Sequence, residues 1–242
     1  MGNEHGKWIM HGVESSSPLC LRSAEELVDY IDKVGFLPLF KNEIPGFSVE
    51  EHTVSRHWWS GDVKNDPWEW RRIIAGTGKV AYGKFFGGKA GYISLDYLPD
   101  FLNFRRDGYD FDTLWEVGKA SFKQKRIMDL FQDGSSYPSY ILKGLAGYGR
   151  GGESNFEGVV TSLQIQGYLA VSDFCQKVNK KGMPYGWFVS VYAAPESIWG
   201  KELVTSRYKA EPEDSLKEII AKVSDSFSQP DEKLIHSVIK SR

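Results

Sequence analysis

The chain has 242 residues, of which 41% are hydrophobic and 26% are charged, as expected for a globular protein of one large or two small domains. The formal net charge of -2 excludes a global positive field, so any nucleic-acid binding must depend on a local patch. Residues 52–106 carry nine Lys and Arg against five Asp and Glu, which indicates either such a patch or a solvated charged face.

Cysteine usage and hydropathy indicate the compartment. Cys20 and Cys175 are far apart and match no metal-ligand spacing, which favours a reducing environment over a disulfide framework. No stretch reaches the roughly 20 apolar residues that span a bilayer, and the segment MGNEHGKWIM is too polar for a signal peptide. We predict a cytoplasmic protein without membrane association.

The first 120 residues predict an arm and an α+β unit. Residues 1–22 are expected to form a mobile arm, and Ser23 with Glu26 makes a capping box for a helix that ends at Gly35. Prolines then interrupt the chain until Asp66 and Pro67 begin a second helix. Two strands joined by Gly87-Gly88 follow. Residues 23–120 are expected to form a degenerate winged-helix-like unit.

This first unit contains aromatic and basic candidates for a site. Four tryptophans between residues 58 and 70 are consistent with a base-stacking platform, with the wall of a ligand site, or with packing in the core. For four basic residues of this unit the alternatives are contact with phosphate and simple exposure to solvent. The aromatic candidates are Trp58, Trp59, Trp68 and Trp70, and the basic candidates are Arg71, Arg72, Lys84 and Lys89.

Residues 121–200 predict a winged helix. An amphipathic helix ending at Gly134 precedes a helix from Pro138, a glycine-rich turn at 147–152, and a helix over 156–169. Two strands with a lysine-rich tip follow, and helix, turn, helix and hairpin is the order of this fold. The predicted class is α+β, with two tandem winged-helix-like units and C-terminal helices over 201–242 that pack on the body or form a dimer contact.

The hairpin is a better candidate for DNA contact than the helix before it. The outward face of the 156–169 helix has no Lys or Arg, and Glu157 would repel phosphate. Lys177, Lys180 and Lys181, hereafter the tip lysines, can bind the phosphate backbone without reading sequence, and Arg150 can add a contact. The alternative is a solvated hairpin whose charges prevent aggregation.

Motifs for chemistry are sparse. Gln164 and Gln166 do not share one helical face, so they could position a water together only if the helix ended there, which Gly167 allows. The histidines match no metal-binding motif. His52 and His57 lie near Glu50 and Glu51 in the sequence, and together these side chains could ligate a metal or hold a proton. We predict no metal and no organic cofactor.

Several segments together resemble a known family. They are GFLPLF (35–40), IPGFSVEE (44–51), DPWEWRR (66–72), AYGKFFGGKAGYIS (81–94), NFEGVVTSLQIQGYL (155–169), DFCQKVNKKGMPYGW (173–187) and YAAPE (192–196). In this order they resemble AlkZ-related proteins, which are winged-helix relatives of alkyl-DNA glycosylases of the AlkZ/YcaQ type.

The resemblance implies tandem winged-helix units, duplex DNA as a partner, and a link to repair of alkylated bases. The glycosylases carry a Gln-x-Gln or Gln-x-Asp motif in their N-terminal part, whereas the match here, Gln164 to Gln166, comes late in the chain. If the activity is present, a glutamine would aim water at the N-glycosidic bond. The alternative is a non-enzymatic winged-helix protein that binds a small molecule or a protein partner.

Overall fold

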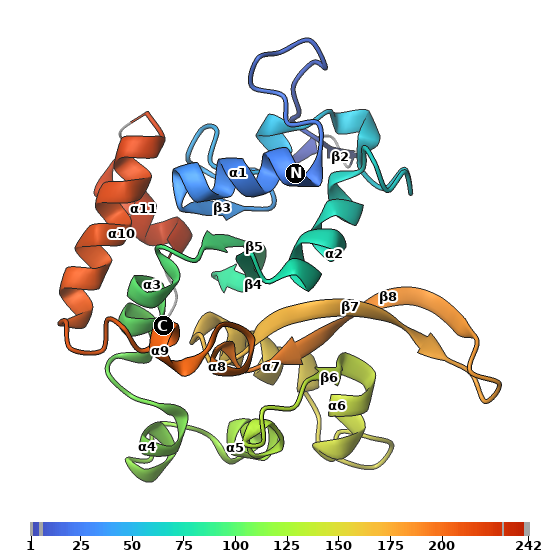
Figure 1. Ribbon diagram of the computed structural model, residues 1–242, viewed down its shortest axis with the longest axis vertical. Helices are drawn as coiled ribbons and strands as arrows, with labels where there is room; N and C mark the ends of the chain where they lie inside the picture. Colours follow the sequence, from blue (N-terminus) through green and yellow to red (C-terminus); the bar gives the residue numbers. More distant parts are fainter. Residues whose placement is uncertain (1, 5–6, 229, 240–242) are drawn as a thin grey trace.

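The computed structural model describes residues 2–4, 7–228 and 230–239, and it contains two units that are stacked one above the other (Figure 1). Each unit contains a three-stranded antiparallel sheet, and a short strand pair lies at the N-terminus. That pair consists of β1 (Gly2–Glu4) and β2 (Lys7–Ile9).

The first unit begins with a helix that the sequence predicts. Ser23 accepts a hydrogen bond from the Glu26 amide as expected, but the Glu26 carboxylate accepts from the Arg22 amide, so the capping box is displaced by one residue. The sheet order is β3-β5-β4. The elements are α1 (Ala24–Val34), β3 (Phe36–Pro38), the 3-10 turns Glu50–His52 and Ser55–His57, α2 (Pro67–Thr77), β4 (Val80–Phe86) and β5 (Lys89–Ser94).

The second unit has a similar order of elements, except that a helix over Ser139–Leu145 follows its first strand, where the first unit has two 3-10 turns. Its sheet order is β6-β8-β7, so in both units the first strand pairs with the third and the third with the second. The predicted succession of helix, turn, helix and hairpin over residues 135–195 is therefore present. The elements are α5 (Phe122–Met128), a 3-10 turn (Asp129–Phe131), β6 (Tyr137–Pro138), α6 (Ser139–Leu145), α7 (Phe156–Ile165), β7 (Ala170–Val178) and β8 (Pro184–Ala193).

Two helices connect the units. The connecting helices are α3 (Leu98–Arg106) and α4 (Phe111–Glu116). The cap of α4 is Asp110, which accepts from the Thr113 amide, and not Asp112. The segment 195–210 contains the short helices α8 (Pro195–Trp199) and α9 (Lys201–Val204).

The two predicted C-terminal helices are present and pack on the body. They are α10 (Pro212–Ser226) and α11 (Glu232–Ile239), and α10 lies against α3 (Figure 1). A buried polar network joins α10 to α3, in which the Ser215 hydroxyl donates to Asp100 at 2.8 Å and accepts from the Asn103 amide at 3.0 Å. These helices therefore complete the side of the first unit.

The segment predicted to be a mobile arm is hydrogen-bonded to the first unit at several points. The His11 amide donates to the Glu50 carboxylate at 2.8 Å, and the Leu21 amide donates to the His52 carbonyl at 2.8 Å. His52 is buried, and its Nε2 lies 3.0 Å from the Tyr30 hydroxyl and 2.8 Å from the Gly46 carbonyl. The arm and His52 thus belong to the packing of this unit.

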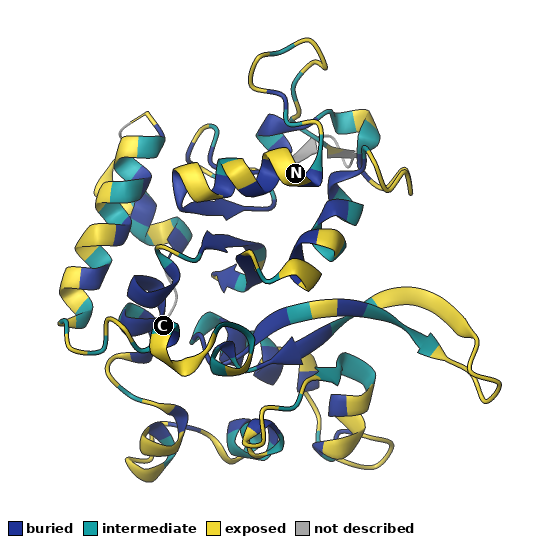
Figure 2. Cartoon of the chain, in the orientation of Figure 1, coloured by how far each residue is buried: buried dark blue, intermediate teal, exposed yellow. Residues whose placement is uncertain are grey.

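Helix α7 lies where the two units meet. Gly88, at the β4–β5 turn, has a φ of +81°, and a Cβ there would approach Thr161 of α7 at 3.3 Å. Gly167 follows α7 with a φ of +77°, and a Cβ there would meet Leu102 of α3 at 2.6 Å. Both positions therefore need glycine, for the left-handed backbone and for close packing. In Figure 2 the buried residues concentrate in the sheets and α3, while the far end of the β7–β8 hairpin is exposed.

Candidate ligand cavity and nucleic-acid interface

A cavity of about 350 Å³ opens between the first unit and the second. Helix α2 and strands β4 and β5 line it from one unit, and α7, β7 and β8 line it from the other. Five residues that the sequence singles out in three separate groups meet there. They are Trp68, Arg71, Lys84, Lys89 and Gln164.

Arg71 is held at the cavity between two aromatic rings. Its guanidinium carbon is 3.6 Å from the centre of the Trp68 ring and 4.6 Å from that of Phe174. The Nε atom is buried and has no hydrogen-bond partner. Burial raises the pKa of the Tyr82 hydroxyl, and the charge of Arg71 together with a side-chain hydrogen bond from it partly opposes that rise. In the described part of the chain, no carboxylate forms an ion pair with Arg71.

Gln164 joins the two units through its side chain. The Lys84 amide donates to its Oε1 at 3.0 Å, and its Nε2 donates to the Val160 carbonyl at 3.3 Å. The residue is 1% exposed. Gln166 is half-buried, donates to the Ser162 hydroxyl at 2.8 Å, and lines a different cavity beside Tyr109 and Tyr168. The two glutamines thus face different cavities, and the structure does not bring them together.

The four candidate tryptophans are also separated. Trp58 and Trp70 are buried in the core, where their indole nitrogens donate to the Thr53 hydroxyl and the Lys64 carbonyl, both at 2.9 Å. Trp59 is half exposed, and its ring centre is 6.1 Å from that of Trp68. Of the four, Trp59 and Trp68 therefore have surface available for a ligand.

The first unit covers part of the outward face of α7. The Lys84 ammonium donates to the Thr161 hydroxyl at 3.3 Å, and Gly88 packs on the same turn of the helix. On the side of α5, the Gln124 amide donates to the Ser162 hydroxyl at 3.5 Å. These contacts cover part of the middle of α7, whereas Glu157 and Gly158 in its first turn stay exposed.

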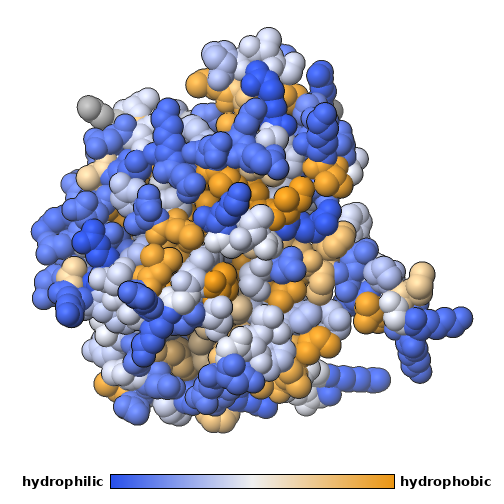
Figure 3. Space-filling model, in the orientation of Figure 1, coloured by the Kyte–Doolittle hydropathy of each residue, from blue (hydrophilic) through white to orange (hydrophobic). Residues whose placement is uncertain are grey.

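The β7–β8 hairpin is the most exposed regular element of the described chain (Figures 1 and 2). Residues 179–188 are all exposed, and Trp187 is 90% exposed. The Asn179 carboxamide oxygen accepts from the amides of Lys181 and Met183, and this holds the tip in one turn. In Figure 3 the tip extends from the body and carries both strongly hydrophilic and hydrophobic side chains.

Two arginines that the sequence suggests as phosphate contacts, Arg72 and Arg150, have different surroundings. Arg72 pairs with Glu69 at 2.7 Å, and its guanidinium lies 4.1 Å from the centre of the Phe188 ring, so it supports the base of the hairpin. Arg150 is exposed in the turn between α6 and α7. Of the tip lysines, Lys177 has its ammonium 5.6 Å from the centre of the Tyr140 ring, and Lys180 and Lys181 are exposed at the turn.

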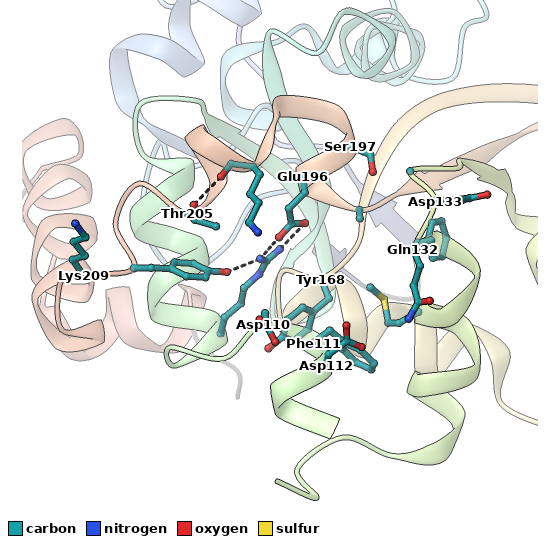
Figure 4. Close-up of a pocket in the computed structure, with 17 residues that line it drawn as sticks. Asp110, Phe111, Asp112, Gln132, Asp133, Tyr168, Glu196, Ser197, Thr205 and Lys209 are labelled. Atoms are coloured by element: carbon teal, nitrogen blue, oxygen red, sulfur yellow. Dashed lines mark hydrogen bonds and ion pairs between the residues drawn. The ribbon is translucent and has the colours of Figure 1, made fainter. Parts of the chain in front are cut away.

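A wider cavity of about 910 Å³ lies between α4, the 129–134 turn and α8–α9 (Figure 4). Arg106 lines this cavity and is buried. It pairs with Glu196, and it donates to the Tyr208 hydroxyl at 2.6 Å and to the Gly167 carbonyl at 2.8 Å. Burial lowers the pKa of this guanidinium, but Glu196 and Tyr208 more than offset it, so the pKa stays above its usual value. Because its charge is compensated, Arg106 serves the fold.

Comparison with known proteins identifies the family. A family model described as AlkZ related matches residues 21–240. The chain belongs to the AlkZ-related family. A solved structure of the Streptomyces sahachiroi DNA glycosylase AlkZ is similar to the AlkZ-related chain, with 12% identity and a TM-score of 0.45. The match covers 86% of this chain and 53% of AlkZ, so the chain spans about half the length of that protein. None of the curated proteins compared with the chain matches it.

Sequence reasoning missed several residues that form the sites of this AlkZ-related chain. Tyr82 and Tyr192 line the cavity, and Phe174 covers one face of Arg71. Tyr82 could have been found, because it stands two residues before Lys84 on one strand and therefore on the same face of the sheet. Trp187 could have been found as an aromatic residue close to a lysine-rich tip.

Neither a metal site nor a membrane-spanning helix is present in residues 2–4, 7–228 and 230–239. No three His, Cys, Asp or Glu side chains in these ranges lie close enough together to hold a metal ion. None of the helices in these ranges is long and apolar enough to cross a membrane.

Proposed function

We propose that this AlkZ-related chain is a DNA-binding protein of the cytoplasm with a role in DNA repair, built from two tandem winged-helix units. The shared strand order of the two sheets, together with the succession of α6, α7 and the β7–β8 hairpin in the second unit, supports the winged-helix assignment. Membership of a family related to AlkZ, which is a DNA glycosylase, supports the role in repair. The arm (1–22), the two units (23–120 and 121–200) and the C-terminal extension (201–242) are the proposed divisions.

The exposed β7–β8 hairpin carries the proposal. The tip lysines supply positive charge at the most projecting part of the unit, and phosphate contacts of this kind give affinity without sequence readout. Trp187 gives the same hairpin an exposed flat apolar surface that can insert into the minor groove or stack on a displaced base. An exposed tryptophan beside lysines fits DNA better than it fits a solvated loop.

The packing and charge of α7 favour DNA contact through the hairpin over contact through this helix. A winged helix usually reads the major groove with its second helix. Here that helix has no outward Lys or Arg and packs against Lys84 and Gly88 of the first unit. We therefore propose binding to duplex DNA mainly through the backbone, with Arg150 as a further contact. Arg71, Lys84 and Lys89 line the cavity and are not assigned to DNA.

Catalysis by Gln164 and Gln166 stays a prediction. Glycosylase activity would require one of these side-chain amides to position a water. Gln164 already forms hydrogen bonds with Lys84 and Val160, and Gln166 forms one with Ser162. Release of free base from alkylated duplex DNA measures the activity directly. Activity that is lost in both Gln164→Ala and Gln166→Ala, with folding intact, would support the catalytic role.

DNA binding is tested by fluorescence anisotropy with a labelled duplex over a range of salt concentrations. Changing the three tip lysines to Glu should weaken binding strongly and reduce the salt slope by about 0.9 for each phosphate that is no longer neutralised. The matched control changes Lys209, Lys217 and Lys233 to Glu, because these are exposed lysines at or near α10 and α11, on the other side of the molecule from the hairpin (Figure 1). Equal decreases in affinity in both triple variants would contradict a specific role of the hairpin.

A further inference from the structure

The cavity between the units combines aromatic walls with positive charge that no acidic residue neutralises. Arg71 and Lys84 contribute a guanidinium and an ammonium group to its lining, and none of its described lining residues is Asp or Glu. Neither residue forms an ion pair within the described ranges. Lys89 also lines this cavity, but it borders a neighbouring hollow that contains Glu43, so Arg71 and Lys84 carry the argument.

We propose that this cavity is a binding site for a small flat ring that bears an anionic group, and that binding there does not require DNA to be bound at the hairpin. The anion is a carboxylate or a phosphate, because the planar guanidinium of Arg71 matches either of them. A lysine ammonium adds a second, compact charge. Binding would give the guanidinium of Arg71 the counter-charge that the described protein residues do not supply.

The position of Arg71 favours an anion over water as the partner of its guanidinium. That group is sandwiched by Trp68 and Phe174, which fixes its plane, and its Nε is buried without a hydrogen bond. A buried polar atom left unpaired destabilises the fold unless something else at the site compensates it. A guanidinium held between two rings also loses little conformational freedom when it binds a carboxylate or phosphate.

The walls and the size suit a planar ligand. Trp68, Phe40, Tyr82 and Tyr192 provide aromatic surface from both units, and a volume of about 350 Å³ is at the small end of ligand pockets. Burial raises the pKa of the Tyr192 hydroxyl to about 12, so this group is neutral at pH 7 and can donate a hydrogen bond to an anion. A cationic ring would instead face the positive charges of Arg71 and Lys84 with no lining carboxylate to offset them.

Isothermal titration calorimetry with defined probes tests the proposal. The probes are 2-naphthoate and adenosine 5′-monophosphate, which present a carboxylate and a phosphate on flat rings, and the neutral control is 2-naphthamide. We expect at least one anionic probe to bind about tenfold or more tightly than the amide, as a charge-assisted hydrogen bond implies. No binding of either anion at millimolar concentration, or equal binding of the amide, would overturn the proposal.

Paired variants connect binding to the cavity. Arg71→Met keeps an apolar stem between the two rings and removes the charge, so the affinity for the anion should fall about tenfold or more. Arg72→Met is the matched control, because Arg72 is the next residue on α2, pairs with Glu69, and does not line the cavity. Similar decreases in affinity in both variants would refute the site.

The triple Glu variant of the tip lysines separates this inference from DNA binding. Its affinity for the anionic probe should be unchanged, since these lysines do not line the cavity. If the wild-type chain binds the probe but not DNA, only the proposed function is contradicted. If it binds DNA but neither probe, only the cavity proposal is contradicted.

Discussion

The side chain of Gln164 is predicted to hold the two units together, and its removal should destabilise the whole chain. Its Oε1 is the acceptor for the backbone amide of Lys84, which stands 80 residues earlier. In Gln164→Ala that amide loses its acceptor while the strand around it stays packed. The expected effect is therefore a decrease in stability, separate from any effect on chemistry.

The magnitude follows from the hydrogen bond that the substitution removes. Leaving a buried backbone N–H without a partner costs about 1–3 kcal/mol. The vacated space adjoins the cavity, so a water can enter and satisfy part of that demand, which places the decrease in the free energy of unfolding at about 1–2 kcal/mol. For a chain of this length, about 2–4 °C of Tm corresponds to each kcal/mol, so Tm should fall by about 2–8 °C.

Urea denaturation followed by circular dichroism measures this decrease, with Gln166→Ala as the control. Gln166 is half-buried, and its side chain donates to Ser162 on its own helix, so its replacement should cost about 0.5 kcal/mol or less. If Gln164→Ala were as stable as the wild type, or if both variants were destabilised equally, the idea of an inter-unit hydrogen bond would be refuted.

Three further predictions concern the hairpin, the C-terminal helices and alkaline pH. Trp187→Ala should weaken duplex binding by about 1–3 kcal/mol in anisotropy while changing the stability by less than about 0.5 kcal/mol, and an unchanged affinity would remove this side chain from the interface. Ser215→Ala should cost about 1–3 kcal/mol in urea denaturation, because Asp100 and Asn103 both lose a buried partner, whereas Ser224→Ala on the same helix should cost little. Burial raises the pKa of Tyr192 to about 12, so the folded chain keeps this proton while the unfolded chain releases it above about pH 10. The stability contributed by this residue should be complete below pH 10 and should fall by about 1.4 kcal/mol per pH unit between pH 10 and 12, and Tyr192→Phe should flatten that fall.

The element order of the second unit is predictable because local signals agree there. Apolar periodicity marks its helices, glycine marks its turns, and a glycine among lysines marks the tip of its hairpin. The starts of α3 and α4 are less predictable. Ser94 and Asp112 are good capping residues, but the chain caps the helices at Tyr97 and Asp110, because packing fixes where each helix begins.

The candidate site is predictable in its parts but not as a whole. Trp68, Arg71 and Lys84 are separate candidates in the sequence, for stacking and for phosphate contact. Their meeting with Gln164 depends on α7 packing against β4, which is a contact between distant parts of the chain that no local pattern encodes. The burial of Trp58 and Trp70 is likewise open from sequence, since an aromatic cluster is equally compatible with a core and with a surface site.

The β7–β8 hairpin connects the cavity with the proposed DNA surface. Phe174 and Tyr192 lie at its base beside Arg71 and the cavity, Phe188 packs on Arg72 further along, and the tip lysines lie at its end. Because α2 contacts both the cavity and the hairpin, an anion that shifts Arg71 would bias the position of the hairpin. Such coupling is reciprocal, so a probe that changes duplex affinity must have its own affinity changed by duplex by the same factor. Probe and duplex affinities that do not change each other would instead mean that the two sites act independently on one rigid frame.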